Sequence, residues 1–292
     1  MILIGVIVFI LGAIIGSFLN VVILRLGTGK GLGGRSMCFN CGKILKWYEL
    51  IPILSFFIQR GHCRKCYSRI SYQYPIVEFL TGLVFVLIFW KFGYWDFIGN
   101  WKLLASRSFS EVGEIGNLIE IVFYWLIFSI LITISIYDFR HKIIPDKLVW
   151  LFAILSLFSY LFRVNSLDIR AYSLLLNHII AGVALALPLF LIWLLSKGRL
   201  MGLGDAKLAL GIGFLLGLSK GIVAFVLSFW IGAIFGILLI IASRFIRAYL
   251  RSYPRFSASM KSEIPFGPFL IISTFIVFLF DLDLVTLFSW IY

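Results

Sequence analysis

The sequence predicts an all-α polytopic membrane protein with about eight transmembrane helices and a small cytoplasmic zinc-ribbon-like domain between spans one and two. Three observations lead to this fold class. Of the 292 residues, 62% are hydrophobic and only 13% are charged, whereas globular domains carry about 25% charged residues. Apolar runs of about twenty residues recur along the chain, the length that crosses a hydrocarbon core of roughly 30 Å. All four cysteines lie in one long polar segment near the N-terminus.

The first apolar run resembles a signal peptide in position, but no basic segment precedes it and no small-residue cleavage site follows it. We therefore expect a retained helix. The remaining runs continue to the C-terminal end of the sequence. The expected spans are Ile2–Leu24, Pro75–Trp90, Leu118–Tyr137, Leu148–Phe162, Asn177–Leu195, Leu208–Leu218, Ile222–Ser243 and Pro265–Phe280.

The basic residues predict the orientation of these spans. Twenty of the 26 Lys and Arg residues lie in one set of alternate loops, residues 25–74, 138–147, 196–207 and 244–264. By the positive-inside rule this set is cytoplasmic, so both termini lie outside and the protein is a multi-pass protein of the cytoplasmic (inner) membrane. The net charge of +13 is then explained by topology, with a further attraction to anionic membrane lipid. No nucleic-acid partner is needed to account for it.

The spans and loops divide the chain into three expected parts. Residues 1–24 form the first transmembrane helix, and residues 25–74 form the cytoplasmic domain with its two CxxC pairs. Residues 75–292 form a membrane-embedded domain that holds the remaining spans.

The cysteines occur as two pairs, Cys38 and Cys41 in "CFNC" and Cys63 and Cys66 in "CRKC", with 21 residues between the pairs. This arrangement is typical of a zinc ribbon or zinc knuckle. Four thiolates complete a tetrahedral site with no open position, which predicts a structural rather than a catalytic zinc ion. Two disulfides are the alternative, and the cytoplasmic location of the loop argues against them because thiols there stay reduced.

Two carboxylates lie at junctions between a span and the cytoplasm. Asp138 follows about twenty largely apolar residues and begins "DFRHKIIPD", and Asp205 ends "GLGD" just before the sixth span. Ionisable groups at such positions are functional candidates. The alternatives are a solvated interface charge for Asp138 and a helix N-cap for Asp205, although Asp146 fits a cap better.

The glycines before Asp205 favour a catalytic role. Gly202 and Gly204 allow a sharp turn and a close approach of another segment to the carboxylate. Two carboxyl groups brought together share one proton, because ionising both at short range is unfavourable. The ionised group takes a proton from water and the protonated group polarises a carbonyl. This chemistry suits peptide hydrolysis in a chain that shows no Ser/His pair and no open metal site.

A set of motifs resembles one known family from the first span to the last. The set is "GSFLNVVILRL", the two CxxC pairs flanking "WYELIPILSF", then "ISYQYPIVE", "DFRHKIIPD", "GLGDAK" and "PFGPF". In this order the motifs resemble those of the type IV prepilin peptidases, the GxGD-type aspartic proteases that process prepilins. The combination is far more specific than GxGD alone.

This resemblance implies an inner-membrane aspartic endopeptidase that removes the basic leader of prepilins and pseudopilins after a glycine at the cytoplasmic face. Asp138 and Asp205 fall on the family's catalytic aspartates, and Gly202 and Gly204 on its GxGD glycines. The four cysteines fall on the zinc-binding cysteines of many members. Many members also methylate the new N-terminal amine with S-adenosylmethionine, an activity associated with the cytoplasmic domain.

Two departures from the family pattern and three alternatives remain at this point. Phe39 stands where a proline is common, and Glu49-Leu50 stands where Asp-Asn is common. One alternative is a protease without methylation, of the preflagellin type, which typically lacks the paired cysteines. A second is another intramembrane aspartic protease. A third is a multi-pass transporter with ion sites at the span edges, although no inverted repeat is visible.

Overall fold

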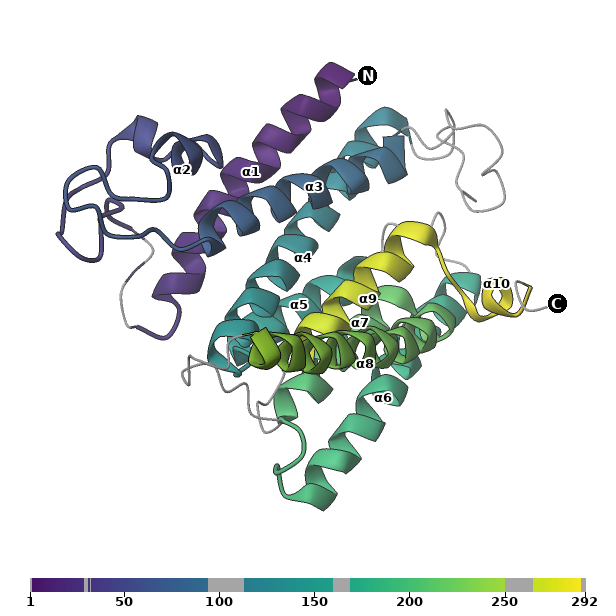
Figure 1. Ribbon diagram of the computed structural model, residues 1–292. Helices are drawn as coiled ribbons and strands as arrows, with labels where there is room; N and C mark the ends of the chain where they lie inside the picture. Colours follow the sequence, from purple (N-terminus) through teal and green to yellow (C-terminus); the bar gives the residue numbers. More distant parts are fainter. Residues whose placement is uncertain are drawn as a thin grey trace. The chain divides into compact units, whose positions relative to one another are not determined.

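The computed structural model describes residues 2–28, 31, 33–93, 113–159, 169–249 and 265–289 (Figure 1). Within these ranges the chain is helical, and extended pairing is limited to two isolated β-bridges. Each of the eight expected spans falls on a helix. In chain order the elements are α1 (Ile2–Arg25), η1 (Trp47–Glu49), α2 (Leu54–Ile58), α3 (Gln73–Gly93), α4 (Gly113–His141), α5 (Asp146–Phe158), α6 (Ile169–Ser196), α7 (Leu203–Leu216), α8 (Leu218–Tyr249), α9 (Gly267–Phe280) and α10 (Leu284–Ser289).

Five of these helices are long and apolar enough to cross a membrane: α1, α3, α4, α6 and α8. The helices at the other three expected spans are shorter, with 13 residues in α5 and 14 each in α7 and α9. A helix of 14 residues is about 21 Å long, less than the hydrocarbon core. The end of the expected span Leu148–Phe162 lies outside the described residues. The all-α membrane fold is confirmed.

The chain divides into two compact units, residues 1–133 and residues 134–292, and α4 passes from the first into the second. In the first unit α1 packs along α3. Their backbones meet at glycines: a Cβ on Gly12 would lie 2.8 Å from Gly82 Cα, and one on Gly16 would lie 2.8 Å from Glu78 Cα. Small residues allow helices in a membrane to approach this closely.

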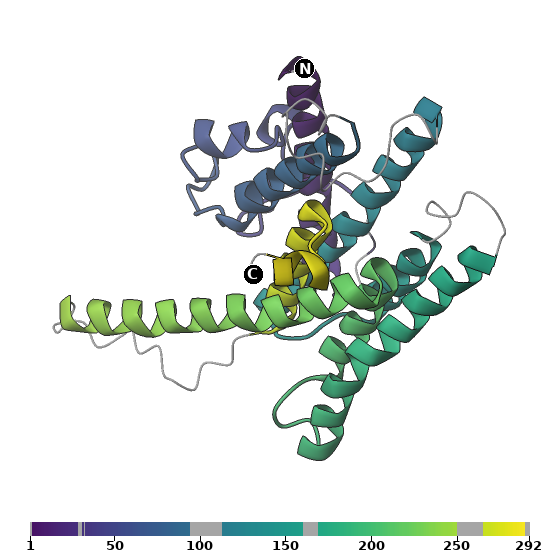
Figure 2. The ribbon, with the colours of Figure 1, turned by 90° about the vertical axis from the view of Figure 1, so that its right-hand side faces the viewer.

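In the second unit α7 is the central helix, and it packs against α5, α6, α8 and α9. Its glycines again set the spacing. Gly211 lies against the Phe152 ring of α5, where a Cβ would be 2.6 Å away, and Gly213 lies against the backbone of α6. Figure 2 shows α8 as one long helix that crosses the start of α9. Most of α7 is therefore buried, including the turn that carries Asp205.

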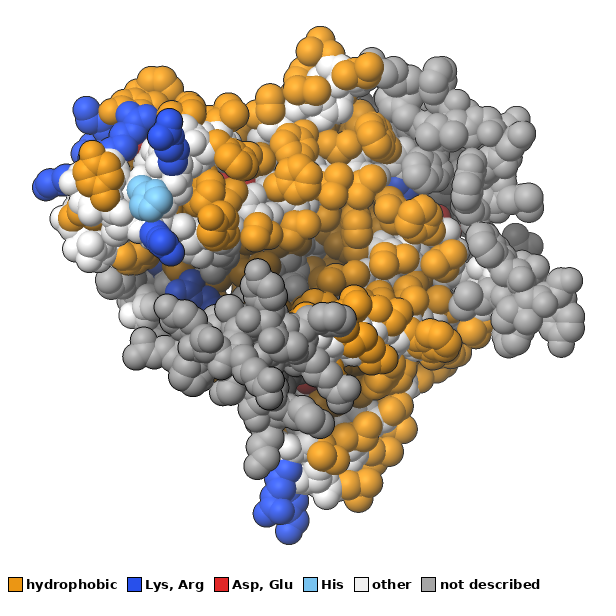
Figure 3. Space-filling view, viewed as in Figure 1, with side chains coloured by type: hydrophobic (Ala, Val, Ile, Leu, Met, Phe, Trp, Pro, Cys, Tyr) orange, Lys and Arg blue, Asp and Glu red, His pale blue; other side chains and the backbone are white. Residues whose placement is uncertain are grey.

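Large hydrophobic side chains cover much of the face seen in Figure 3. The long helices carry many exposed large hydrophobic residues, such as Ile7 and Ile10 on α1 and Ile237 and Leu238 on α8. An apolar surface of this extent suits contact with lipid tails rather than with water.

Gly213→Ala tests the contact between α6 and α7. The added methyl group would overlap backbone atoms of Ala181 and Gly182, and overpacking of this kind costs about 1–3 kcal/mol. We expect a lower midpoint of thermal unfolding in detergent. The control is Gly236→Ala on α8, where the new methyl group meets no described atom within 4 Å. Equal midpoints for the two variants would contradict the contact.

Candidate active site and metal centre

Asp138 lies in the last turn of α4 and is 4% exposed. The helix stops there because Lys142 adopts a left-handed conformation, with φ of 55°, and its N–H donates to the Asp138 carbonyl at 2.7 Å. The helix C-terminus thus fixes the backbone that carries the carboxylate. The solvated-charge alternative is wrong for this residue, since its side chain is buried.

Asp205 is the third residue of α7 and is 9% exposed. The N-cap of α7 is Gly202 rather than Asp205, so the capping alternative for Asp205 is wrong. Asp146 does not cap either: it is the first residue of α5, after Pro145, and its Oδ1 pairs with Lys207 Nζ at 2.7 Å.

The two glycines before Asp205 differ in what they permit. Gly202 has φ of −76°, which any residue adopts, and a Cβ there would have 3.9 Å to its nearest neighbour, Asp205 Oδ2. A Cβ on Gly204 would lie 2.7 Å from the Cβ of Ile144. The close approach expected from both glycines is therefore required only at Gly204, where the segment after α4 touches the start of α7.

Gly267, the first residue of α9, is a third glycine at this site. A Cβ there would lie 2.5 Å from Asp138 Oδ2 and 3.3 Å from Ile144 Cδ1. Its backbone N–H donates a hydrogen bond to the Asp138 carboxylate, and the α9 N-terminus adds the favourable end of a helix dipole. The motif "PFGPF" contained this residue, but only the fold shows which group it faces.

The second unit thus brings both sequence-predicted aspartates together. Asp205 and Asp138 are near enough to interact electrostatically. Among the described residues, Asp138 Oδ2 and Asp205 Oδ1 are buried without a hydrogen-bond partner. Buried polar atoms are rarely left unpaired, because each costs about 1–3 kcal/mol. Two such atoms on neighbouring carboxyl groups are suited to bind a water molecule or a substrate carbonyl.

The cysteine segment forms two knuckles with the same backbone pattern. In the first, the Cys38 N–H donates to the Lys43 carbonyl and the Gly42 N–H donates to the Cys38 carbonyl, each at 2.9 Å. In the second, Cys63 pairs in the same way with Ser68 and Tyr67, again at 2.9 Å. Gly42 and Tyr67 both have positive φ, 66° and 55°. This repeated turn directs each CxxC pair toward the other.

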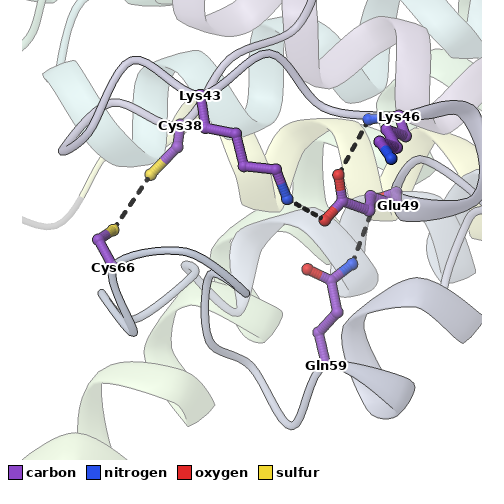
Figure 4. A network of polar contacts seen from close by, with 6 residues as sticks. All are labelled: Cys38, Lys43, Lys46, Glu49, Gln59 and Cys66. Carbon is purple, nitrogen blue, oxygen red and sulfur yellow. Dashed lines mark hydrogen bonds and ion pairs between the residues drawn. The ribbon is translucent and has the colours of Figure 1, made fainter.

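The four thiols fit a tetrahedral metal site. All four Sγ atoms lie within 4.8 Å of one another, and Cys38 and Cys66 are 3.8 Å apart (Figure 4). Sulfurs bound at 2.3 Å to one zinc ion would be about 3.8 Å apart. The Ser68 hydroxyl, 3.1 Å from Cys66 Sγ, lowers the pKa of that thiol to about 6. A lowered pKa favours the thiolate, the form that binds metal.

Glu49 joins the first knuckle, which contains Lys43, to Gln59 at the end of α2. It is buried, accepts a hydrogen bond from Lys43 Nζ at 2.7 Å and another from the Lys46 N–H at 3.0 Å, and its carbonyl accepts from Gln59 Nε2 (Figure 4). The Lys43 ammonium group lowers the pKa of Glu49. Sequence reasoning noted Glu49 as a departure from the family pattern and missed this structural role.

Comparison with known proteins identifies the family. Residues 10–92 match the Bacterial Peptidase A24 N-terminal domain, and residues 125–237 match the Type IV leader peptidase family. A prepilin leader peptidase/N-methyltransferase of Xanthomonas campestris is 31% identical over 305 residues, which cover 94% of this chain and 91% of that protein. The chain belongs to the type IV leader peptidase family.

Other relatives carry the same name. The prepilin leader peptidase/N-methyltransferase of Vibrio cholerae is 28% identical over 213 residues, 70% of this chain and 74% of that protein. The one from Myxococcus xanthus is 37% identical over 144 residues, 49% of this chain and 36% of that protein. No solved structure matches the chain. The predicted resemblance is confirmed, and a peptidase family leaves the transporter alternative without support.

The three glycines at the aspartates give a prediction for this site. Gly204→Ala and Gly267→Ala insert a methyl group 2.7 Å from Ile144 Cβ and 2.5 Å from Asp138 Oδ2. Because misplacing a reacting group by 1 Å can cost about 100-fold in rate, we expect prepilin cleavage to fall by about that factor in both variants. Gly202→Ala meets no such contact and should retain most activity. Cleavage rates in detergent check this, and similar losses in all three variants would contradict it.

Proposed function

We propose that this protein is a membrane aspartic endopeptidase that removes the leader peptide of type IV prepilins and pseudopilins, and that it methylates the new N-terminal residue. Asp138 and Asp205 are its catalytic pair. The observation that carries the proposal is the pair of neighbouring buried carboxyl groups, each with an unpartnered oxygen, at the end of α4 and the start of α7. The names of the relatives support the substrate class.

The two carboxyl groups act as one unit that carries a single proton. The ionised group takes a proton from a water molecule, whose oxygen then attacks the scissile carbonyl carbon. The protonated group donates its proton to the carbonyl oxygen. When the tetrahedral intermediate collapses, the C–N bond breaks and the leaving amine takes the proton from the group that activated the water. A hydroxyl of the intermediate returns its proton to the other carboxylate as the new carboxyl group forms, so the pair again holds one proton. Because Gly204 and Gly267 have no Cβ, Ile144 packs against the start of α7 and the start of α9 lies directly against the Asp138 carboxylate.

We also propose that this chemistry takes place at the cytoplasmic face and that both termini lie outside. The support is that 20 of the 26 Lys and Arg residues lie in one set of alternate loops, which includes the two loops that adjoin Asp138 and Asp205. We further propose that residues 25–74 form a cytoplasmic domain and that residues 75–292 form the peptidase domain.

The cytoplasmic domain is proposed to hold zinc through Cys38, Cys41, Cys63 and Cys66. Their mutual distances and the lowered pKa of Cys66 support this donor set. When bound, zinc would cross-link the two knuckles as a structural ion. Methylation would use S-adenosylmethionine as methyl donor. We assign it on the names of the relatives alone, because no set of side chains among the described residues identifies a site for the donor.

Asp138→Asn and Asp205→Asn test the catalytic pair. Loss of a general acid or base costs about 100- to 10,000-fold in rate, so we expect each variant to lose cleavage by at least about 100-fold. The assay incubates the enzyme with a prepilin whose basic leader ends in glycine and follows leader removal by mass spectrometry. Asp283→Asn is the control, because asparagine replaces aspartate well at a cap and Asp283 bonds the Thr286 N–H at the start of α10. Near-normal cleavage by either Asn variant of the pair would overturn the mechanism.

Cys63→Ser tests the metal centre. Cys63 is 4% exposed and sits among the four thiols. Purified wild-type protein should contain about one zinc ion per chain by elemental analysis, and the variant should lose most of it because four ligands are needed for tight binding. Phe39→Ser changes a residue of the first knuckle that lies beside Cys38 but is not a ligand, and it should keep the zinc. A wild type without metal, or full occupancy in Cys63→Ser, would contradict the site.

A further inference from the structure

The segment between α1 and α3 contains a backbone N–H that is held by a buried carboxylate of a membrane span. The Ile53 N–H donates to Glu78 Oε2 at 2.7 Å. Glu78 lies on α3, is 6% exposed, and also accepts a hydrogen bond from the Ser17 hydroxyl on α1. Ile53 has φ of 61°, an unusual conformation for a β-branched residue. The contact therefore fixes a strained turn directly before α2.

The positions of Glu78 and Ser17 along their helices show at what level of the spans the Ile53 turn lies. Glu78 is five residues inside α3 from Gln73, about 7.5 Å along the helix axis, and Ser17 is eight residues inside α1 from Arg25, about 12 Å. Both residues lie inside the stretches that are long and apolar enough to cross a membrane, Ile2–Arg25 and Gln73–Phe92. Figures 1 and 2 show α2 alongside α1 and α3, at a level between the two ends of α1. The start of α2 is therefore level with the spans rather than beyond them.

The face that α2 turns outward is apolar. Leu54, Phe57 and Ile58 are 59%, 67% and 65% exposed, and their i, i+3, i+4 spacing places them on one side of the helix. On the opposite side, Phe56 packs against Tyr72 with ring centroids 5.3 Å apart. A water-facing helix would show polar residues where these three lie.

The surrounding groups suit the surface of a bilayer. Ile76 and Phe79 are exposed on α3 beside Glu78, the residue that binds the turn directly before α2. Exposed apolar side chains therefore lie on both elements near this contact. Trp47 is exposed on η1, and tryptophan is enriched where membranes meet water. Exposed basic side chains follow, among them Arg60 and Lys65, which anionic headgroups attract.

We propose that η1 and α2 dip into the membrane as a shallow re-entrant segment, and that the Leu54, Phe57 and Ile58 face binds the phospholipids of the leaflet at the Arg25 end of α1. Glu78 makes this possible, because a backbone N–H at that depth must have a protein partner. The proposal concerns only the first unit and does not depend on the peptidase activity.

Photocrosslinking of the full-length protein in phospholipid nanodiscs tests the proposal. A benzophenone amino acid replaces Phe57 in one variant and Phe39 in the other. Both phenylalanines are exposed, at 67% and 80%, but Phe39 lies in the Cys38 knuckle. We expect the label at position 57 to form lipid adducts, detected by mass spectrometry, at several times the yield at position 39. Equal yields, or adducts at 57 only with a prepilin or a second copy of the chain, would overturn the proposal.

Two variants of Glu78 test whether its hydrogen bond to the Ile53 N–H holds α2 in the membrane. In Glu78→Gln the side-chain carbonyl still accepts the Ile53 N–H, so lipid labelling at position 57 should persist. In Glu78→Leu no acceptor remains, and labelling should fall toward the yield at position 39. The zinc content of each variant reports whether the knuckles stay folded. Unchanged labelling in Glu78→Leu would show that Glu78 does not hold the segment in the membrane.

Discussion

A carboxylate inside an apolar surrounding is unfavourable unless another group compensates it, and this constraint organises both units of the structure. Glu78 is compensated by the Ile53 N–H and the Ser17 hydroxyl, and Glu49 by Lys43. These two acids are structural because their hydrogen bonds are satisfied within the protein. Asp138 and Asp205 lie in equally buried positions and keep an oxygen without a partner. The contrast separates the acids that hold the fold from the acids available for chemistry.

Composition and the lengths of apolar runs were sufficient to predict the fold class and the approximate places of the long apolar helices, because a span must be apolar over its whole length. Asp138 and Asp205 were also predictable. Charged residues are rare in such a chain, and each stood at a span edge within a motif. The cysteine pairs were similarly clear, since the CxxC spacing reflects a local turn and needs no knowledge of the tertiary structure.

The parts that sequence reasoning missed depend on contacts between distant segments. Gly202 and Gly204 have the same residue type and nearly the same position, yet only Gly204 touches another segment, at Ile144. Gly267 reaches Asp138 from α9, about 130 residues further along the chain. Glu78 looks like one more charge near a span until its partner, Ile53, is known. No periodicity or composition records such pairings, because each is set by how helices pack.

The two cysteine knuckles share one backbone pattern but differ at the corner residue, which is Gly42 in the first and Tyr67 in the second. Glycine adopts positive φ without strain, whereas a residue with a Cβ does so at a cost of about 1 kcal/mol. The knuckle at Tyr67 is thus the weaker half of the metal centre. On loss of the zinc ion proposed above, the amides around Cys63 should exchange with solvent before those around Cys38, so the domain would open in a fixed order from its C-terminal half.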